Sequence, residues 1–167
     1  MGLPNHIDPR KLAMQIIRLE GAVDRSCLPR LAAAVVCITG PVNAKVSFEN
    51  QQSRAKLVDG TVGANVEMQC QRCLDSVAID LQSSFSLQVV SCDEHVDRVA
   101  ESREPWIVEE RMASLHHMLE DELLLVLPAV SYHPSGKCTG DAFMQQQGGD
   151  GVIDSPFDIL KSIKKRV

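Results

Sequence analysis

Two of the six cysteines in this chain have the spacing of a metal-binding turn. Cys70 and Cys73 are separated by two residues, so two thiolates from one tight turn could bind the same zinc ion. His133 and Cys138 lie in a later segment that contains proline and glycine, and they could supply two further ligands of a tetrahedral site. We therefore expect these four residues to converge in space. They are candidate zinc ligands, and no other cofactor is predicted.

These four residues have two other interpretations. A thioredoxin-like redox motif has the same Cys-x-x-Cys spacing, but it requires a helix N-terminus inside a βαβ unit. Cys70 and Cys73 instead lie between two predicted antiparallel strands, which excludes the redox motif. The remaining alternative is that all four residues are unmetallated and that Cys70 is partly buried.

Catalytic motifs are scarce in the sequence, which has no GxGxxG, phosphate-binding P-loop, GxSxG or HExxH. His116 and His117 are adjacent on a predicted helix and point about 100° apart, so we expect one near the core and one in solvent. Glu120, Asp121 and Glu122 are predicted to form an acidic surface that is solvated or faces a partner. Consecutive helical carboxylates do not converge as a general acid and base. The protein is therefore predicted not to be an enzyme.

Two helices are predicted in the first forty residues. Asp8 is a suitable N-cap before Pro9, apolar residues then recur at helical spacing, and Gly21 is a natural C-terminal stop. A second short helix is expected from Leu28 towards Val36. Helical periodicity ends there, and the pattern changes to alternation.

Alternating apolar and polar residues predict an antiparallel sheet over the next fifty residues. Residues 42–48 and 55–58 are expected strands, and Asp59 with Gly60 is a hairpin signal. The alternation resumes over residues 62–70 and is clearest over residues 77–89, where one face is apolar throughout. Such a sheet needs a cover on its apolar face.

A long helix is predicted to provide that cover. It starts at Glu109 or Glu110 and ends at Pro128, after an acidic loop and an edge strand around residues 106–108. Its apolar stripe is expected to pack on the sheet and consists of Met112, Leu115, Leu119, Leu123 and Val126. The predicted fold class is α+β: an antiparallel β-sheet covered by N-terminal helices and one long helix, with a flexible C-terminal tail.

Domain organisation follows from the same patterns. Residues 1–139 are predicted to form a single α+β domain, and the Gln/Gly-rich residues 140–154 a flexible linker. Residues 155–167 are predicted to form a short basic amphipathic tail that binds a partner or RNA. Its candidate contact residues are Phe157, Leu160, Lys161, Lys164, Lys165 and Arg166.

Composition excludes several classes of protein. Hydrophobic residues make up 44% and charged residues 23% of the chain, as in globular proteins. No apolar run approaches the roughly 20 residues of a membrane span. Residues 1–10 lack the apolar core of a secretory signal, so we expect a cytoplasmic protein with reduced cysteines. Neither a membrane contact nor a small-molecule substrate is predicted.

Charge is distributed unevenly. Residues 1–73 hold nine basic against six acidic side chains, residues 74–154 four against fifteen, and residues 155–167 four against one. The acidic middle would repel a nucleic-acid backbone, so any RNA contact is expected in the first half or the tail. Alternatively, the acidic stretch meets a basic protein partner.

Four segments together resemble one family in the order expected over nearly the whole chain. Residues 67–74 are similar to its E-x-x-C-x-R-C core, and residues 120–128 to its E-D-E-hydrophobic-L-P helix end. Residues 156–166 resemble its closing P-F-x-x-L…K-K segment, and residues 7–10 also fit. This is the YceD family of bacterial large ribosomal RNA subunit accumulation proteins. Many members carry a cysteine at the position that His133 occupies here.

The resemblance implies a function in ribosome assembly. The expected function is that of a non-enzymatic biogenesis factor supporting the synthesis, processing or stability of large-subunit (23S) ribosomal RNA. Its partner would be that RNA or a pre-ribosomal particle, contacted directly or through an assembly protein. The alternative is a protein-interaction adaptor whose acidic helix binds a basic partner without RNA contact. A nuclease or other RNA-modifying enzyme is disfavoured because no catalytic constellation is present.

Overall fold

A computed structural model describes residues 2–51, 55–134 and 136–139 of the chain. The chain divides into two compact units, residues 1–132 and 133–167. The predicted linker (140–154) and tail (155–167) lie outside the described residues. Within the described ranges, no helix is both long enough and apolar enough to cross a membrane.

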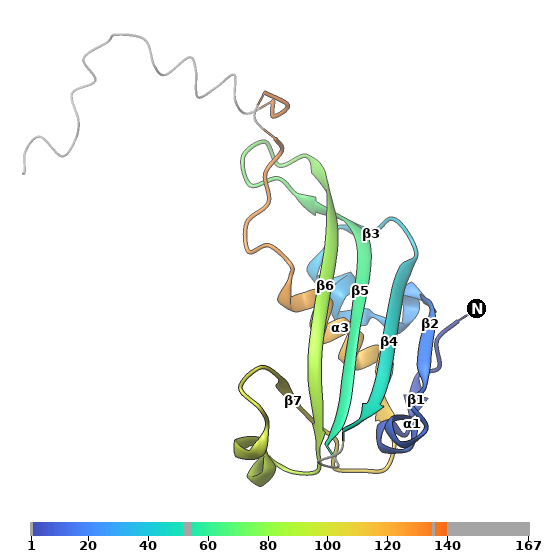
Figure 1. Ribbon diagram of the computed structural model, residues 1–167. Helices are drawn as coiled ribbons and strands as arrows, with labels where there is room; N and C mark the ends of the chain where they lie inside the picture. Colours follow the sequence, from blue (N-terminus) through green and yellow to red (C-terminus); the bar gives the residue numbers. More distant parts are fainter. Residues whose placement is uncertain (1, 52–54, 135, 140–167) are drawn as a thin grey trace, which may run out of the picture. The chain divides into compact units, whose positions relative to one another are not determined.

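The first unit is built on a six-stranded sheet whose long central strands are seen in Figure 1. Its main path has the order β2-β4-β5-β6-β7, and β3 pairs with another part of β5. Every pair is antiparallel except β6 with β7, which is parallel. The strands are β2 (Arg18–Val23), β3 (Cys37–Ile38), β4 (Val42–Asn50), β5 (Lys56–Gln69), β6 (Ser76–Val90) and β7 (Glu104–Ile107).

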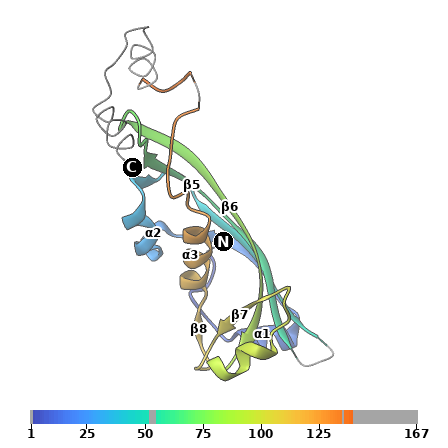
Figure 2. The ribbon, with the colours of Figure 1, turned by 90° about the vertical axis from the view of Figure 1, so that its left-hand side faces the viewer.

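The described residues include three α-helices that accompany this sheet, and Figure 2 shows that α2 and α3 lie on the same side of it. They are α1 (Pro9–Gln15), α2 (Pro29–Ala34) and α3 (Leu115–Leu125). Two short 3₁₀ helices, η1 (Arg25–Cys27) and η2 (Asp93–Arg98), lie in connections. A separate two-stranded sheet pairs β1 (His6–Ile7) with β8 (Ala113–Ser114).

The strict alternation of β6 explains how the sheet is covered. Leu81, Ser83, Phe85 and Leu87 are buried, whereas the residues that alternate with them, Gln82, Ser84 and Ser86, are exposed. Because side chains alternate between the faces of a strand, one face of β6 joins the core and the other meets water. Leu115, Leu119 and Leu123 of α3 recur every four residues and are all fully buried within the same core. The predicted α+β fold class is confirmed, with one parallel strand pair added to the sheet.

The hairpin turn predicted at Asp59 and Gly60 does not form. Asp59 and Gly60 were expected to form a hairpin turn, but β5 continues through both residues. A Cβ atom on Gly60 would lie 2.5 Å from the carbonyl oxygen of Lys45 and 2.6 Å from the Phe85 ring. Glycine is required here because the strands and the Phe85 side chain approach too closely for a larger residue, and not because the chain turns.

The first helix ends earlier than its apolar spacing predicted. Helix α1 stops at Gln15, and Ile16 takes a left-handed conformation with φ 53°. The backbone oxygen of Ile17 then accepts a hydrogen bond of 2.9 Å from the backbone N–H of Phe48 in β4. The following residues therefore form β2, and Gly21 lies within that strand and not at a helix end. Pairing with β4 outweighs the helical pattern of the sequence.

Helix α3 begins later than predicted. Ala113 and Ser114 pair with β1, and the side chain of Ser114 caps the helix by accepting a hydrogen bond of 3.1 Å from the backbone N–H of His117. Met112 therefore precedes the helix and is 47% exposed, so its predicted place in the buried stripe is wrong. Val126, at the C-cap, is also partly exposed. The middle of the stripe packs as expected.

Replacing Leu119 tests how strongly α3 holds the sheet. Leu119 is fully buried, so we expect Leu119→Ala to reduce the free energy of unfolding by about 2–5 kcal/mol through lost transfer energy and the cavity left behind. Urea denaturation followed by circular dichroism measures this loss. Leu125→Ala on the same helix is the control: Leu125 is 73% exposed, and its truncation should change stability by less than about 0.5 kcal/mol. Equal losses in the two variants would contradict this packing.

Candidate functional site

A tight turn between β5 and β6 positions the first two candidate ligands, Cys70 and Cys73. The backbone N–H of Cys70 donates to the oxygen of Asp75 (2.8 Å), and the N–H of Leu74 donates to the oxygen of Cys70 (2.9 Å). Leu74 has φ 66°, a left-handed conformation that reverses the chain within a few residues. These hydrogen bonds fix the loop that we call the knuckle, residues 70–75.

The segment after α3 is bonded to the same knuckle within the first unit. The backbone N–H of Gln71 donates to the oxygen of Ser131 over 2.9 Å. In return, the Ser131 hydroxyl donates to the backbone oxygen of Gln69 over 2.7 Å, and Ser131 is buried. The chain therefore reaches His133 only two residues after a point that is hydrogen-bonded to the knuckle.

The four candidate ligands form a Cys₃His cluster. One ligand atom from each of Cys70, Cys73, His133 and Cys138 lies within 4.8 Å of the others. Cys70 and Cys138 are buried, and the other two are partly exposed. Pro134 supports the second pair, because its oxygen accepts a hydrogen bond of 3.0 Å from the backbone N–H of Lys137. The four residues come together as the spacing in the sequence led us to expect.

The chemistry of this cluster suits a metal ion. Three sulfur atoms and one imidazole nitrogen are a donor set that tetrahedral zinc sites use, with metal–ligand distances of about 2.0–2.3 Å. Ligand atoms on such a tetrahedron are separated by about 3.3–3.8 Å. A maximum separation of 4.8 Å is close enough for small side-chain rotations to reach that geometry. The cluster could therefore hold a metal ion.

An exposed pair of side chains, Arg72 of the knuckle and Tyr132, was not predicted from the sequence. The guanidinium carbon of Arg72 lies 5.2 Å from the centre of the Tyr132 ring, within cation–π distance. Tyr132 is 52% exposed. The presence of the chain's one tyrosine next to His133 was the available signal, but only the folded chain shows that it meets Arg72.

The histidine pair on α3 behaves as predicted. His116 is buried, and its Nε2 atom lies 3.0 Å from the backbone oxygen of Leu3. His117 is exposed, and its Nδ1 atom lies 3.4 Å from a carboxylate oxygen of Asp121. The two rings therefore do not face one common ligand.

The predicted acidic surface of Glu120, Asp121 and Glu122 is wrong for two of its three members. Glu120 is 1% exposed and Glu122 is 8% exposed, so only Asp121 faces solvent. The Oε2 atom of Glu122 accepts a hydrogen bond of 3.1 Å from the hydroxyl of Ser83 on the sheet. Three consecutive acidic residues in the sequence do not show which of them is buried. The packing of α2 and β6 around α3 decides which carboxylates reach water.

Glu120 caps a second helix. Its Oε1 atom accepts hydrogen bonds from the backbone N–H groups of Arg30 (2.7 Å) and Leu31 (3.0 Å) in the first turn of α2. Its Oε2 atom accepts from Nε of Arg30 over 3.0 Å. Asp121 lies 2.7 Å from the same guanidinium, and Asp121 and Glu120 together raise the pKa of Arg30. These hydrogen bonds satisfy backbone donors that a helix start otherwise leaves unpaired.

Removing the Glu120 carboxylate should lower the free energy of unfolding far more than removing the charge of Asp121. We expect Glu120→Ala to lower the free energy of unfolding by about 3–5 kcal/mol, because buried N–H donors lose their acceptor and Arg30 loses a buried partner. Asp121→Asn removes the adjacent, half-exposed charge and should cost less than about 1 kcal/mol. Chemical denaturation of both variants measures the difference. A small loss in Glu120→Ala would show that water replaces the carboxylate.

The predicted contact residues of the tail lie outside the described residues. Phe157, Leu160, Lys161, Lys164, Lys165 and Arg166 therefore keep only their sequence-based assignment.

Comparison with known proteins identifies sequence similarity to one family. The family described as "Large ribosomal RNA subunit accumulation protein YceD" matches residues 58–164, a range that includes the knuckle, α3 and all four candidate ligands. A Haemophilus influenzae protein of that same name is 29% identical over 172 aligned residues, which cover 98% of this chain and 97% of the relative. No solved structure matches the chain.

Proposed function

The chain belongs to the YceD family, and we propose that it is a ribosome-biogenesis factor that supports the synthesis, processing or stability of large-subunit (23S) ribosomal RNA. The observation that carries this proposal is the match to that family over residues 58–164, together with a relative named for the same RNA that aligns over nearly its full length. We place the protein in the cytoplasm, where the large ribosomal subunit is assembled.

A non-enzymatic function is the second part of the proposal. It is supported by the positions of two carboxylates on α3: Glu120 caps α2, and Glu122 is hydrogen-bonded to Ser83. These carboxylates are held by structural partners and face different elements, so they are not arranged as a general acid and base. The protein would therefore act by binding.

Two parts of the chain are proposed to contact RNA. Arg72, placed over Tyr132, offers a cation and an aromatic ring on the surface at the knuckle. The guanidinium can contact a phosphate, and the tyrosine ring can stack on an unpaired base. The basic tail would add phosphate contacts through Lys161, Lys164 and Lys165. Phe157 and Leu160 would provide an apolar anchor for the tail.

RNA binding and RNA accumulation can be tested with the same variants. Cells that lack the protein should contain less 23S relative to 16S ribosomal RNA, and the full chain should restore the ratio. A chain without residues 155–167 should restore it poorly while keeping its thermal stability. Binding of purified protein to 23S RNA fragments should weaken steeply as salt rises, because phosphate contacts release counterions.

The controls separate direct contact from an adaptor function. Arg72→Ala should weaken RNA binding, whereas Arg18→Ala, which removes an exposed charge from β2, should change it little. Absence of RNA affinity in the full chain, combined with normal rescue of 23S RNA in cells, would support the adaptor alternative. Unfolding of the chain that lacks residues 155–167 would show instead that the tail belongs to the core.

We further propose that the Cys₃His cluster holds a structural zinc ion. Cys70 and Cys73 would be bound as thiolates from the knuckle, and Cys138 and the imidazole of His133 would complete the tetrahedron. Such an ion would fix the segment after α3 at the knuckle, because metal binding stabilises the conformation that brings its ligands together. It would supply no reaction chemistry in this role, since all four positions would be taken by protein ligands.

Zinc content tests this proposal directly. Protein purified without chelator should contain about one zinc per chain by elemental analysis, and Cys73→Ser should lose most of it. Cys37→Ser is the matched control, because Cys37 is an exposed free cysteine outside the cluster, and it should keep its zinc. A metal-free wild-type protein with the same thermal stability before and after zinc addition would refute the proposal.

A further inference from the structure

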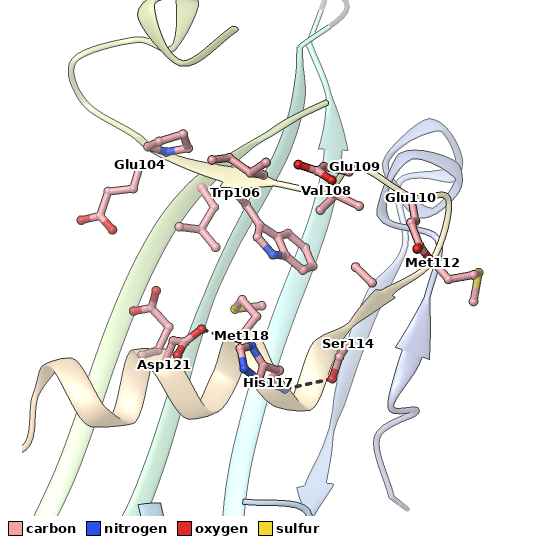
Figure 3. A pocket seen from close by; sticks show the side chains of 15 residues that line it. Glu104, Trp106, Val108, Glu109, Glu110, Met112, Ser114, His117, Met118 and Asp121 are labelled. Carbon is pink, nitrogen blue, oxygen red and sulfur yellow. Dashed lines mark hydrogen bonds and ion pairs between the residues drawn. The ribbon is translucent and has the colours of Figure 1, made fainter. Parts of the chain in front are cut away.

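A cavity of about 420 Å³ lies between β7, the loop that follows it and α3. Figure 3 shows the indole of Trp106 on one side of this cavity and Met118, His117 and Asp121 of α3 on the other. Leu87 of β6 also lines it. The volume is within the range of about 300–1,000 Å³ that ligand-binding pockets have. All of these residues belong to the first unit.

The lining of this cavity is acidic. No lysine or arginine lines it, and its five carboxylates are Glu104, Glu109, Glu110, Asp121 and Glu122. Asp121 is paired with Arg30 and lies near His117. The side chains of the three glutamates on β7 and the following loop have no ion pair within the part of the chain that the structure describes. Negative potential therefore concentrates at this cavity.

Glu122 is the buried member of this set. Its carboxylate receives one hydrogen bond, from Ser83 to Oε2, and has no cationic partner among the described residues. Burial, which outweighs the Ser83 hydrogen bond, raises the pKa of Glu122, and nearby Glu104 and Asp121 raise it further. Burying a charged carboxylate without a cation carries a desolvation penalty, and a positive group that entered the cavity would offset this penalty.

Trp106 gives the cavity a second feature that suits a cation. Its ring faces the space in Figure 3, and its indole N–H has no acceptor among the described residues. The face of an indole attracts a guanidinium or ammonium group held within about 6 Å of the ring. Aromatic and carboxylate groups on opposite sides of one cavity are therefore complementary to a positively charged side chain.

We propose that this cavity binds an arginine or lysine side chain from a basic segment of a protein partner. A polypeptide fits better than a small polyamine, because Ile107 and Met112, which also line the cavity, are 40% and 47% exposed and could take apolar neighbours of the basic residue. RNA is disfavoured because the five carboxylates would repel phosphates. This site goes beyond the proposed function in RNA accumulation and depends neither on zinc nor on direct RNA contact.

Trp106 is the only tryptophan in the chain, so its fluorescence reports binding at this cavity. The probe is a fluorescein-labelled peptide of alternating arginine and leucine residues, and the control peptide carries citrulline, a neutral analogue, in place of arginine. The unlabelled arginine peptide should change Trp106 emission in a saturable way. The citrulline peptide should bind at least tenfold more weakly, because it lacks the positive charge.

Matched variants locate the contact. Glu104→Gln combined with Glu122→Gln should weaken the arginine peptide about tenfold by anisotropy, since two cavity carboxylates are neutralised. Glu49→Gln combined with Asp80→Asn removes the same charge from exposed positions outside the cavity and should change affinity less than twofold. Trp106→Leu should weaken the peptide about 2- to 30-fold. Circular dichroism and thermal melting of each variant establish that it is folded.

Three results would overturn the proposal. One is equal weakening by the cavity and control charge variants, which would indicate non-specific attraction. Another is citrulline peptide binding as tightly as arginine peptide. The third is displacement of the peptide from Trp106 by spermidine or by a 23S RNA fragment at equal or lower concentration, which would assign the cavity to a polyamine or to RNA. None of these results would affect the proposed function in RNA accumulation.

Discussion

The buried carboxylate of Glu120 links α3 to α2, two helices whose contacting residues are 90 positions apart in the sequence. Helix α2 has six residues and no side-chain cap of its own, so its first N–H groups depend on this acceptor. Because Glu120 is 1% exposed, water cannot replace it without opening the core. One buried carboxylate, through three hydrogen bonds to Arg30 and Leu31, thus fixes the start of the short helix against the longer one.

The position of α3 in turn determines the rest of the first unit. Its leucines cover the sheet, Glu122 is hydrogen-bonded to β6, and the residues just before it pair with β1. The chain that leaves its C-terminal end is bonded to the knuckle through Ser131. The same helix therefore connects the core, the candidate ligand turn and the acidic cavity, although only its apolar stripe is visible as a repeat in the sequence.

Much of the site was predictable because its chemistry is local. The two-residue spacing of Cys70 and Cys73 predicts a metal-binding turn, and the proline and glycine around His133 and Cys138 predict a second one. Their convergence required the long hairpin of β5 and β6 to end beside the chain that follows α3. By contrast, nothing local relates Trp106 to Glu122 or Arg72 to Tyr132, so the cavity and the stacked pair became visible only in the folded chain.

The sequence alone determined the α+β class, the alternating strands, the covered face of the sheet and the four candidate cysteine and histidine ligands. These properties follow from side-chain periodicity and from short spacings, which do not depend on distant residues. Tertiary structure decided the ends of the helices, the use of Gly60 within a strand and the burial of Glu120 and Glu122. The physical reason is that each depends on a neighbour far away in the sequence: β4 for the end of α1, Phe85 for Gly60, and α2 and β6 for the two carboxylates.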